Sequence, residues 1–130
     1  MRKCNVGIIG LGTVGSGIYK ILNSEICPHP ILKEIEIVKI AVKDLKKKRE
    51  IEIENKLLTD DPTKLINDPS IDVIVEVMGG LEIAKDIIMK SLKAGKSVVT
   101  ANKAVMARYS SEIYATAAKE QVYVLSEAAV

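Results

Sequence analysis

The chain has 130 residues, of which 48% are apolar and 28% are charged. This length and composition are typical of one globular domain with its own hydrophobic core. The net charge of +2 is too small to indicate nucleic-acid binding. No stretch approaches the roughly 18 apolar residues of a membrane span, and the amino terminus shows no signal-peptide pattern. We therefore expect a cytoplasmic protein that binds neither nucleic acid nor membranes.

The stretch that organises the chain lies near the amino terminus. A short apolar run with Val6, Ile8 and Ile9 predicts a buried parallel strand, and helical spacing of apolar residues follows after residue 17. Between them lies a Gly-x-Gly-x-x-Gly sequence. Strand, glycine-rich turn and helix in this order are typical of a dinucleotide-binding unit, in which the pyrophosphate lies against free N–H groups at the start of the helix. The predicted cofactor contacts are Gly10, Leu11, Gly12, Thr13, Val14 and Gly15.

Each glycine of this loop has a separate role in that interpretation. Gly10 permits the tight turn, Gly12 lets the backbone approach the pyrophosphate, and Gly15 lets the helix pack close to the strand. The alternative is a glycine-rich turn of any α/β domain. The strands and helices that follow the loop disfavour this alternative.

Strands and helices alternate along the rest of the chain. The predicted strands are residues 35–42, 71–77, 96–100 and 122–127. The predicted helices are Thr13–Ser24, a short one from Pro62 to near Asn67 with Asp61 as its cap, Glu82–Ala94, and one from Ser110 or Ser111 to Glu120. Residues 50–58 are expected to form an edge hairpin or an irregular excursion. This order predicts an α/β fold: a Rossmann-type doubly wound parallel sheet with helices on both faces.

The ends of two predicted strands carry further candidates. Lys43 can pair with the 2′-phosphate of NADP, whereas Asp44 can bind the ribose of NAD, and both can also be ordinary loop charges. Because Lys43 comes first and basic residues 46–49 follow, NADP is favoured over NAD. Gly79 and Gly80 suit the close passage of a ligand, but they equally suit the start of a helix.

The sequence resembles the amino-terminal nucleotide-binding region of homoserine dehydrogenases. The matching segments are Gly-Leu-Gly-Thr-Val-Gly at 10–15, Val-Lys-Asp at 42–44, Val-Glu-Val-Met-Gly-Gly at 75–80, Gly-Lys-Ser-Val-Val-Thr-Ala-Asn-Lys-Ala at 95–104 and Ser-Glu-Ala-Ala-Val at 126–130. They cover essentially the whole chain in the family's order. The resemblance implies the reversible reduction of aspartate-4-semialdehyde to homoserine with NADPH or NADH, in the pathway to threonine, isoleucine and methionine.

The resemblance also implies roles for single residues. Met78 and Gly79 would line the nucleotide, although Met78 departs from the small or hydroxylated residue expected there. Thr100 and Lys103 would approach the nicotinamide, and Lys103 would be one of two catalytic lysines. Its ammonium would stabilise or protonate the oxygen that becomes negative when hydride adds to an aldehyde. The backbone carbonyls of Glu127 and Val130 match part of a sodium site.

The family's second lysine and acidic substrate ligands would lie beyond residue 130. We therefore expect residues 1–130 to be a dinucleotide-binding domain without a substrate-binding domain, which is catalytically incomplete alone and belongs to a homo-oligomeric parent. Two alternatives remain open. One is the cofactor domain of another NAD(P)-dependent dehydrogenase, of the aspartate or sugar type, and the other is a stand-alone NAD(P)-sensing regulatory domain.

Overall fold

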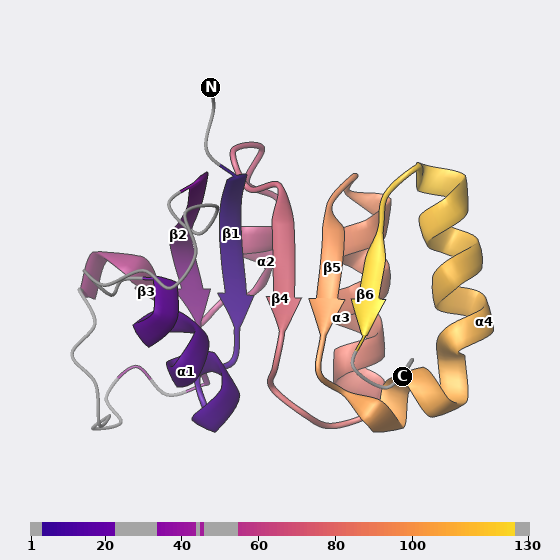
Figure 1. The fold of residues 1–130 in the computed structure, drawn as a ribbon, viewed down its shortest axis with the longest axis horizontal. Helices are drawn as coiled ribbons and strands as arrows, with labels where there is room; N and C mark the ends of the chain where they lie inside the picture. Colours follow the sequence, from indigo (N-terminus) through magenta and orange to yellow (C-terminus); the bar gives the residue numbers. More distant parts are fainter. Residues whose placement is uncertain (1–3, 23–33, 44, 46–54, 127–130) are drawn as a thin grey trace.

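A computed structural model describes residues 4–22, 34–43, 45 and 55–126. They form a six-stranded sheet in the order β3-β2-β1-β4-β5-β6, and all neighbouring strands are parallel (Figure 1). The strands are β1 (Cys4–Ile9), β2 (Ile35–Ala41), β3 (Leu58–Thr59), β4 (Val73–Glu76), β5 (Ser97–Thr100) and β6 (Val124–Ser126). The helices are α1 (Thr13–Leu22), α2 (Thr63–Ile66), α3 (Glu82–Lys93) and α4 (Lys103–Glu120), with a 3₁₀ turn η2 (Asn55–Leu57).

The winding of this sheet confirms the predicted Rossmann-type fold. From β1 the chain builds outward to β2 and β3, and it then returns to β4 on the other side of β1 before it continues to β5 and β6. The direction of winding therefore reverses between β1 and β4. In open α/β sheets, ligands bind in the crevice that forms at such a reversal, outside the carboxyl ends of the strands.

Helices cover both faces of the sheet, as predicted. In Figure 1, α1 lies on the near face, whereas α2 and α3 lie behind the strands. Because side chains of a strand alternate between the faces, Ile8 belongs to the apolar cluster beside α1 and Ile9 belongs to the cluster beside α2, α3 and α4. The near face of β5 and β6 carries the neighbouring side chains of Val99 and Leu125, which are 37% and 64% exposed.

The start of α4 differs from the prediction. This helix begins at Lys103 instead of Ser110 or Ser111. The reason is the side chain of Asn102, whose Oδ1 accepts a hydrogen bond from the backbone N–H of Val105 at 3.1 Å. An N-cap of this kind satisfies one of the backbone donors that a new helix leaves unpaired. Asparagine directly after a strand was the signal for this cap in the sequence.

Two other predicted elements are corrected in detail. Residues 50–54 lie outside the described part, and Leu58 and Thr59 pair in parallel with β2, so the described part of 50–58 contains no hairpin. The short helix begins at Thr63, one residue after Pro62. The carboxylate of Asp61 still accepts the N–H of Thr63 at 2.9 Å.

On α3, Ile87, Ile88 and Leu92 are buried, whereas Ile83 is 60% exposed. Ile83 belongs to the first turn of α3, and the three buried residues lie on the stripe that faces the sheet. The predicted strands at 35–42, 71–77 and 96–100 are each confirmed with slightly shorter bounds. The described portion of Thr13–Ser24 forms α1, and β6 begins at Val124, two residues later than predicted.

The contact between α1 and the glycine turn depends on the absence of a side chain at Gly15. A Cβ atom at this position would lie 2.6 Å from the backbone oxygen of Gly10, well inside van der Waals contact. A backbone oxygen cannot move aside as the end of a flexible side chain can. The role predicted for Gly15 in close helix–strand packing therefore agrees with the structure.

We predict that Gly15→Ala lowers the free energy of unfolding by about 1–3 kcal/mol, the usual cost of overpacking a tight contact. Gly17→Ala is the matched control, since it lies in the same helix and a Cβ there meets no described atom within 4 Å. We expect this control to gain about 0.5–1 kcal/mol from its higher helix propensity. Urea unfolding followed by circular dichroism measures both changes. Equal stabilities of the two variants would contradict the prediction.

Candidate functional site

Four strand ends meet at one edge of the sheet. Backbone hydrogen bonds connect them in a row: Gly10 N to Ala41 O at 2.9 Å, Val77 N to Ile9 O at 3.0 Å, and Ala101 N to Glu76 O at 3.2 Å. The segments that follow β2, β1, β4 and β5 are therefore neighbours in this order. They contain most of the predicted site residues, and the winding reversal between β1 and β4 lies among them.

The glycine loop and the end of β4 are in backbone contact. Gly10 has a φ of 103°, and a Cβ there would lie 2.8 Å from the Cα of Met78. A residue with a side chain at position 10 would push these two segments apart. The structure thus brings Gly10 and Met78, two of the predicted cofactor contacts, together, and Met78 is partly buried against the core.

The start of α1 offers free N–H groups beside this contact. The first α-helical bond runs from Ser16 N to Gly12 O at 2.9 Å, so the N–H groups of residues 12–15 have no partner within the helix. Gly12 is exposed, and a Cβ there would meet no described atom within 4 Å. These groups, at the positive end of the helix dipole, can bind an anion such as a pyrophosphate.

The flanking segments place three further candidates. Lys43 is exposed directly after β2, whereas Asp44 lies outside the described residues. Gly79 and Gly80 are exposed and both have a positive φ, of 78° and 84°. The turn after β4 therefore has a backbone conformation that glycine adopts readily and other residues rarely do.

Lys103 and Thr100 have different surroundings. Lys103 is the first residue of α4, at the carboxyl end of β5, and its side chain is exposed. Thr100 is only 1% exposed, and its hydroxyl donates a hydrogen bond to Oε2 of Glu76 at 2.9 Å. The hydroxyl of Thr100 is thus used inside the protein, while the ammonium of Lys103 is available to a ligand.

Glu76 is a feature of this edge that the sequence analysis missed. Its side chain is fully buried, and Oε1 has no hydrogen-bond partner in the part of the chain that the structure describes. Burial raises the pKa of the Glu76 carboxyl above its usual value. The hydroxyl of Thr100 and nearby polar groups of Met78, Asn102 and Gly79 oppose this rise. The signal in the sequence was an acidic residue inside the otherwise apolar strand Val73–Val77.

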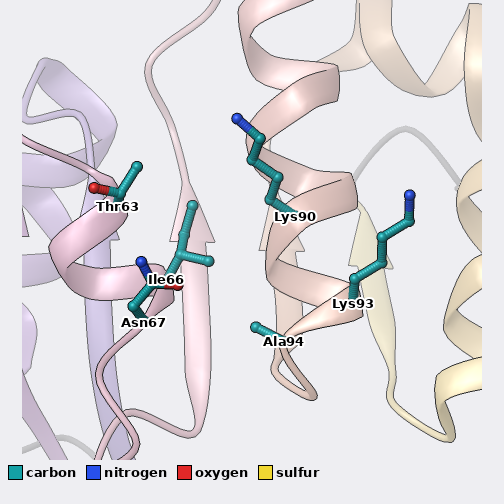
Figure 2. A pocket seen from close by; sticks show the side chains of 6 residues that line it. All are labelled: Thr63, Ile66, Asn67, Lys90, Lys93 and Ala94. Carbon is teal, nitrogen blue, oxygen red and sulfur yellow. The ribbon is translucent and has the colours of Figure 1, made fainter.

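A separate cavity of about 460 Å³ lies between α2 and α3. Figure 2 shows its lining residues, which come from α2 and from the carboxyl-terminal part of α3; they are Thr63, Ile66, Asn67, Lys90, Lys93 and Ala94. None of the predicted cofactor residues is among them. The end of α3 lies at the opposite edge of the sheet from the glycine loop, so this cavity is not part of the candidate site.

The predicted sodium ligands Glu127 and Val130 lie outside the described residues. Within residues 4–22, 34–43, 45 and 55–126, no group of three or more His, Cys, Asp or Glu side chains is arranged to hold a metal ion. No helix in these ranges is long and apolar enough to cross a membrane.

We predict that Glu76→Gln gains stability relative to wild type as the pH rises. Well below pH 4.5, the usual pKa of glutamate, both states of wild type hold this proton. Above it, the unfolded state loses the proton while the folded state keeps it, so the free energy of unfolding decreases until the folded-state pKa is reached. The slope for one proton is at most about 1.4 kcal/mol per pH unit. Glutamine cannot ionise, so the free energy of unfolding of the variant does not undergo this decrease.

Urea unfolding of both proteins at pH 5 and pH 8 measures this effect. The advantage of the glutamine variant should be larger at pH 8. Glu36→Gln, at an exposed carboxyl of β2, measures the effect of removing a surface charge. A stability difference between wild type and Glu76→Gln that is the same at both pH values would refute the prediction.

Comparison with known proteins identifies the family. A model of "Homoserine dehydrogenase, NAD binding domain" matches residues 10–127. A homoserine dehydrogenase of Synechocystis sp. is 46% identical over 125 residues, which are 96% of this chain and 29% of the relative. One of Bacillus subtilis is 42% identical over 132 aligned positions, which cover 100% of this chain and 30% of the relative.

A solved structure agrees with these sequence matches. The crystal structure of S. aureus homoserine dehydrogenase at pH 6.0 has a TM-score of 0.87 and 41% identity, and the match covers 98% of this chain and 33% of that one. The chain thus spans about a third of the length of the relatives it matches. The resemblance predicted from the motifs is confirmed, and the chain belongs to the homoserine dehydrogenase family as its NAD-binding domain.

Proposed function

We propose that this chain is the cofactor-binding part of an enzyme that reversibly reduces aspartate-4-semialdehyde to homoserine with NADPH or NADH. The observation that carries the proposal is the anion-binding start of α1, in backbone contact with the end of β4 at the winding reversal. The relatives named above are homoserine dehydrogenases. Residues 1–130 are then a dinucleotide-binding domain, and the substrate-binding domain belongs to a longer protein.

The residues at this edge divide the binding of the dinucleotide between them. Backbone N–H groups of residues 12–15 would hold the pyrophosphate, and the exposed ammonium of Lys43 would pair with a 2′-phosphate. Because Gly79 has no side chain, the turn after β4 would leave room for the nucleotide to pass. Lys43 is exposed two residues after Ala41, whose backbone oxygen accepts the N–H of Gly10, and from this position we infer a preference for NADP over NAD.

The nicotinamide would supply or accept the hydride, and Lys103 would act on the substrate. Lys103 is exposed at the start of α4, after β5, and this segment lies at the same edge of the sheet as the glycine loop. A cation there favours the negative charge that develops on a carbonyl oxygen during reduction, and it can donate the proton that completes the alcohol.

The rest of the site would come from the longer protein. We infer that it supplies the second lysine, the acidic substrate ligands and the dimer contacts, and that the protein works in the cytoplasm as a homo-oligomer. The backbone carbonyls of Glu127 and Val130 would contribute to a sodium site there. The substrate links the protein to the synthesis of threonine, isoleucine and methionine.

We predict that calorimetric titration of this chain gives tighter binding of NADPH than of NADH. Lys43→Ala should weaken NADPH binding about tenfold, the value of one charge-assisted contact, and leave NADH binding nearly unchanged. Lys119→Ala is the control, because Lys119 is an exposed lysine in the last turn of α4, whereas the first turn of this helix lies at the candidate site. Equal losses for both cofactors, or none, would exclude Lys43 as the 2′-phosphate contact. Gly12→Val, at a position where a Cβ would meet no described atom within 4 Å, should abolish binding of either cofactor without unfolding the protein.

We predict that Lys103→Met in the longer protein lowers kcat by at least about a hundredfold, the usual effect of losing a general acid. The KM for the cofactor should change little, since the pyrophosphate and the adenosine are bound elsewhere. Steady-state kinetics with aspartate-4-semialdehyde and NADPH measure both constants, and Lys119→Met is the matched control. A variant with a normal kcat would remove Lys103 from the chemistry.

A further inference from the structure

Three buried polar side chains form a connected chain beneath the candidate site. The hydroxyl of Thr100 donates to Oε2 of Glu76 at 2.9 Å and accepts from the backbone N–H of Asn102 at 3.0 Å. The exposed fractions of Glu76, Thr100 and Asn102 are 0%, 1% and 9%. Hydrogen bonds in such a dry environment are strong, and each broken one leaves a costly unpaired group.

Asn102 connects this chain to both loops that flank the cofactor edge. Its Nδ2 donates to the backbone oxygen of Gly80 at 2.6 Å, and its Oδ1 caps α4 through the N–H of Val105 at 3.1 Å. Gly80 belongs to the turn after β4, and α4 begins with Lys103. The position of Asn102 therefore sets the separation between that turn and Lys103.

Glu76 decides how the hydroxyl of Thr100 is oriented. A hydroxyl has a single proton, and here it is given to Glu76. Its lone pairs are then free to accept the N–H of Asn102. If residue 76 were apolar, nothing in this arrangement would direct the proton of Thr100 away from Asn102.

Stability alone does not account for a carboxyl at this place. Glu76 lies on the same face of β4 as Ile74, which is fully buried. A hydrophobic side chain would fill the space without the cost of removing a carboxyl group from water. Oε1, which has no hydrogen-bond partner among the described residues, adds to that cost. What the carboxyl contributes is an acceptor for the proton of Thr100, which leaves the hydroxyl oxygen to accept the N–H of Asn102.

We propose that Glu76 is a positioning residue of the cofactor site: through Thr100 and Asn102 it holds the Gly79–Gly80 turn and the first turn of α4, with Lys103, at a fixed separation. Glu76 is fully buried, and the hydrogen bonds of Thr100 and Asn102 connect it to these two segments. The inference rests on the proposed function, because the separation matters only if both segments contact the dinucleotide.

Glu76→Gln and Glu76→Met test this role in the cofactor-free protein. Glutamine is uncharged, has the same shape and still accepts from Thr100, whereas methionine has similar length and no comparable acceptor. Amide hydrogen exchange at Asn102 and Val105 should be about tenfold faster in Glu76→Met and close to wild type in Glu76→Gln. The amides of Ile113 and Ala117, in the middle of α4, are internal controls that should not change.

Calorimetric titration with NADPH on the same proteins tests the functional part. We expect about tenfold weaker binding for Glu76→Met, and binding within about twofold of wild type for Glu76→Gln. Should Glu76→Met fail to fold, Thr100→Val and the conservative Thr100→Ser replace the pair, because only serine keeps the hydroxyl that accepts from Asn102.

Unchanged exchange at Asn102 and Val105 in the apolar variant would overturn the proposal, as would equal losses in the glutamine and methionine variants. Faster exchange with unchanged NADPH affinity would also overturn it, because the positioning would then have no bearing on the cofactor. If wild type binds neither NADPH nor NADH, the proposed function fails. The positioning of a cofactor site fails with it, even where the exchange pattern is as expected.

Discussion

The parallel direction of all the strands is the constraint on which the rest of this structure depends. Because neighbouring strands run the same way, the carboxyl ends of β2, β1, β4 and β5 lie at one edge of the sheet. Segments far apart in the sequence, at residues 10–15, 43, 78–80 and 101–103, follow these ends and become neighbours. A reversed strand among them would have sent its loop to the opposite edge, where α3 ends and the cavity of Figure 2 lies.

Close approach of backbones gives this edge its shape. Gly10 contacts the backbone of Met78, and Gly15 contacts the carbonyl of Gly10. These contacts bring the start of α1 against the end of β4. The N–H groups of α1 are thereby left open at the winding reversal, which explains how a fold with little polar side-chain chemistry can bind a charged dinucleotide.

Beneath this edge, a short polar network replaces apolar packing. Glu76, Thr100 and Asn102 lie among buried side chains such as Ile74 and Val98, and they connect two strand ends to one helix start. Two residues of the network, Thr100 and Asn102, belong to the Thr-Ala-Asn-Lys segment that matches the family. In the structure this segment has two buried residues that form hydrogen bonds inside the protein, followed by an exposed lysine at the site edge.

The sequence by itself determined the order of the elements, the glycine loop and the family. These depend on local patterns: apolar runs for β1, β2, β4 and β5, helical spacing for α1 and α3, and motifs that need no partner to be recognised. The start of α4 was missed because residues 103–109 show weak helical periodicity, and because the capping bond from Val105 to Asn102 is seen only in the folded structure. The role of Glu76 and the inward hydroxyl of Thr100 were decided by tertiary structure alone. Their hydrogen bonds join residues 24 positions apart, and only the pairing of β4 with β5 brings them into contact.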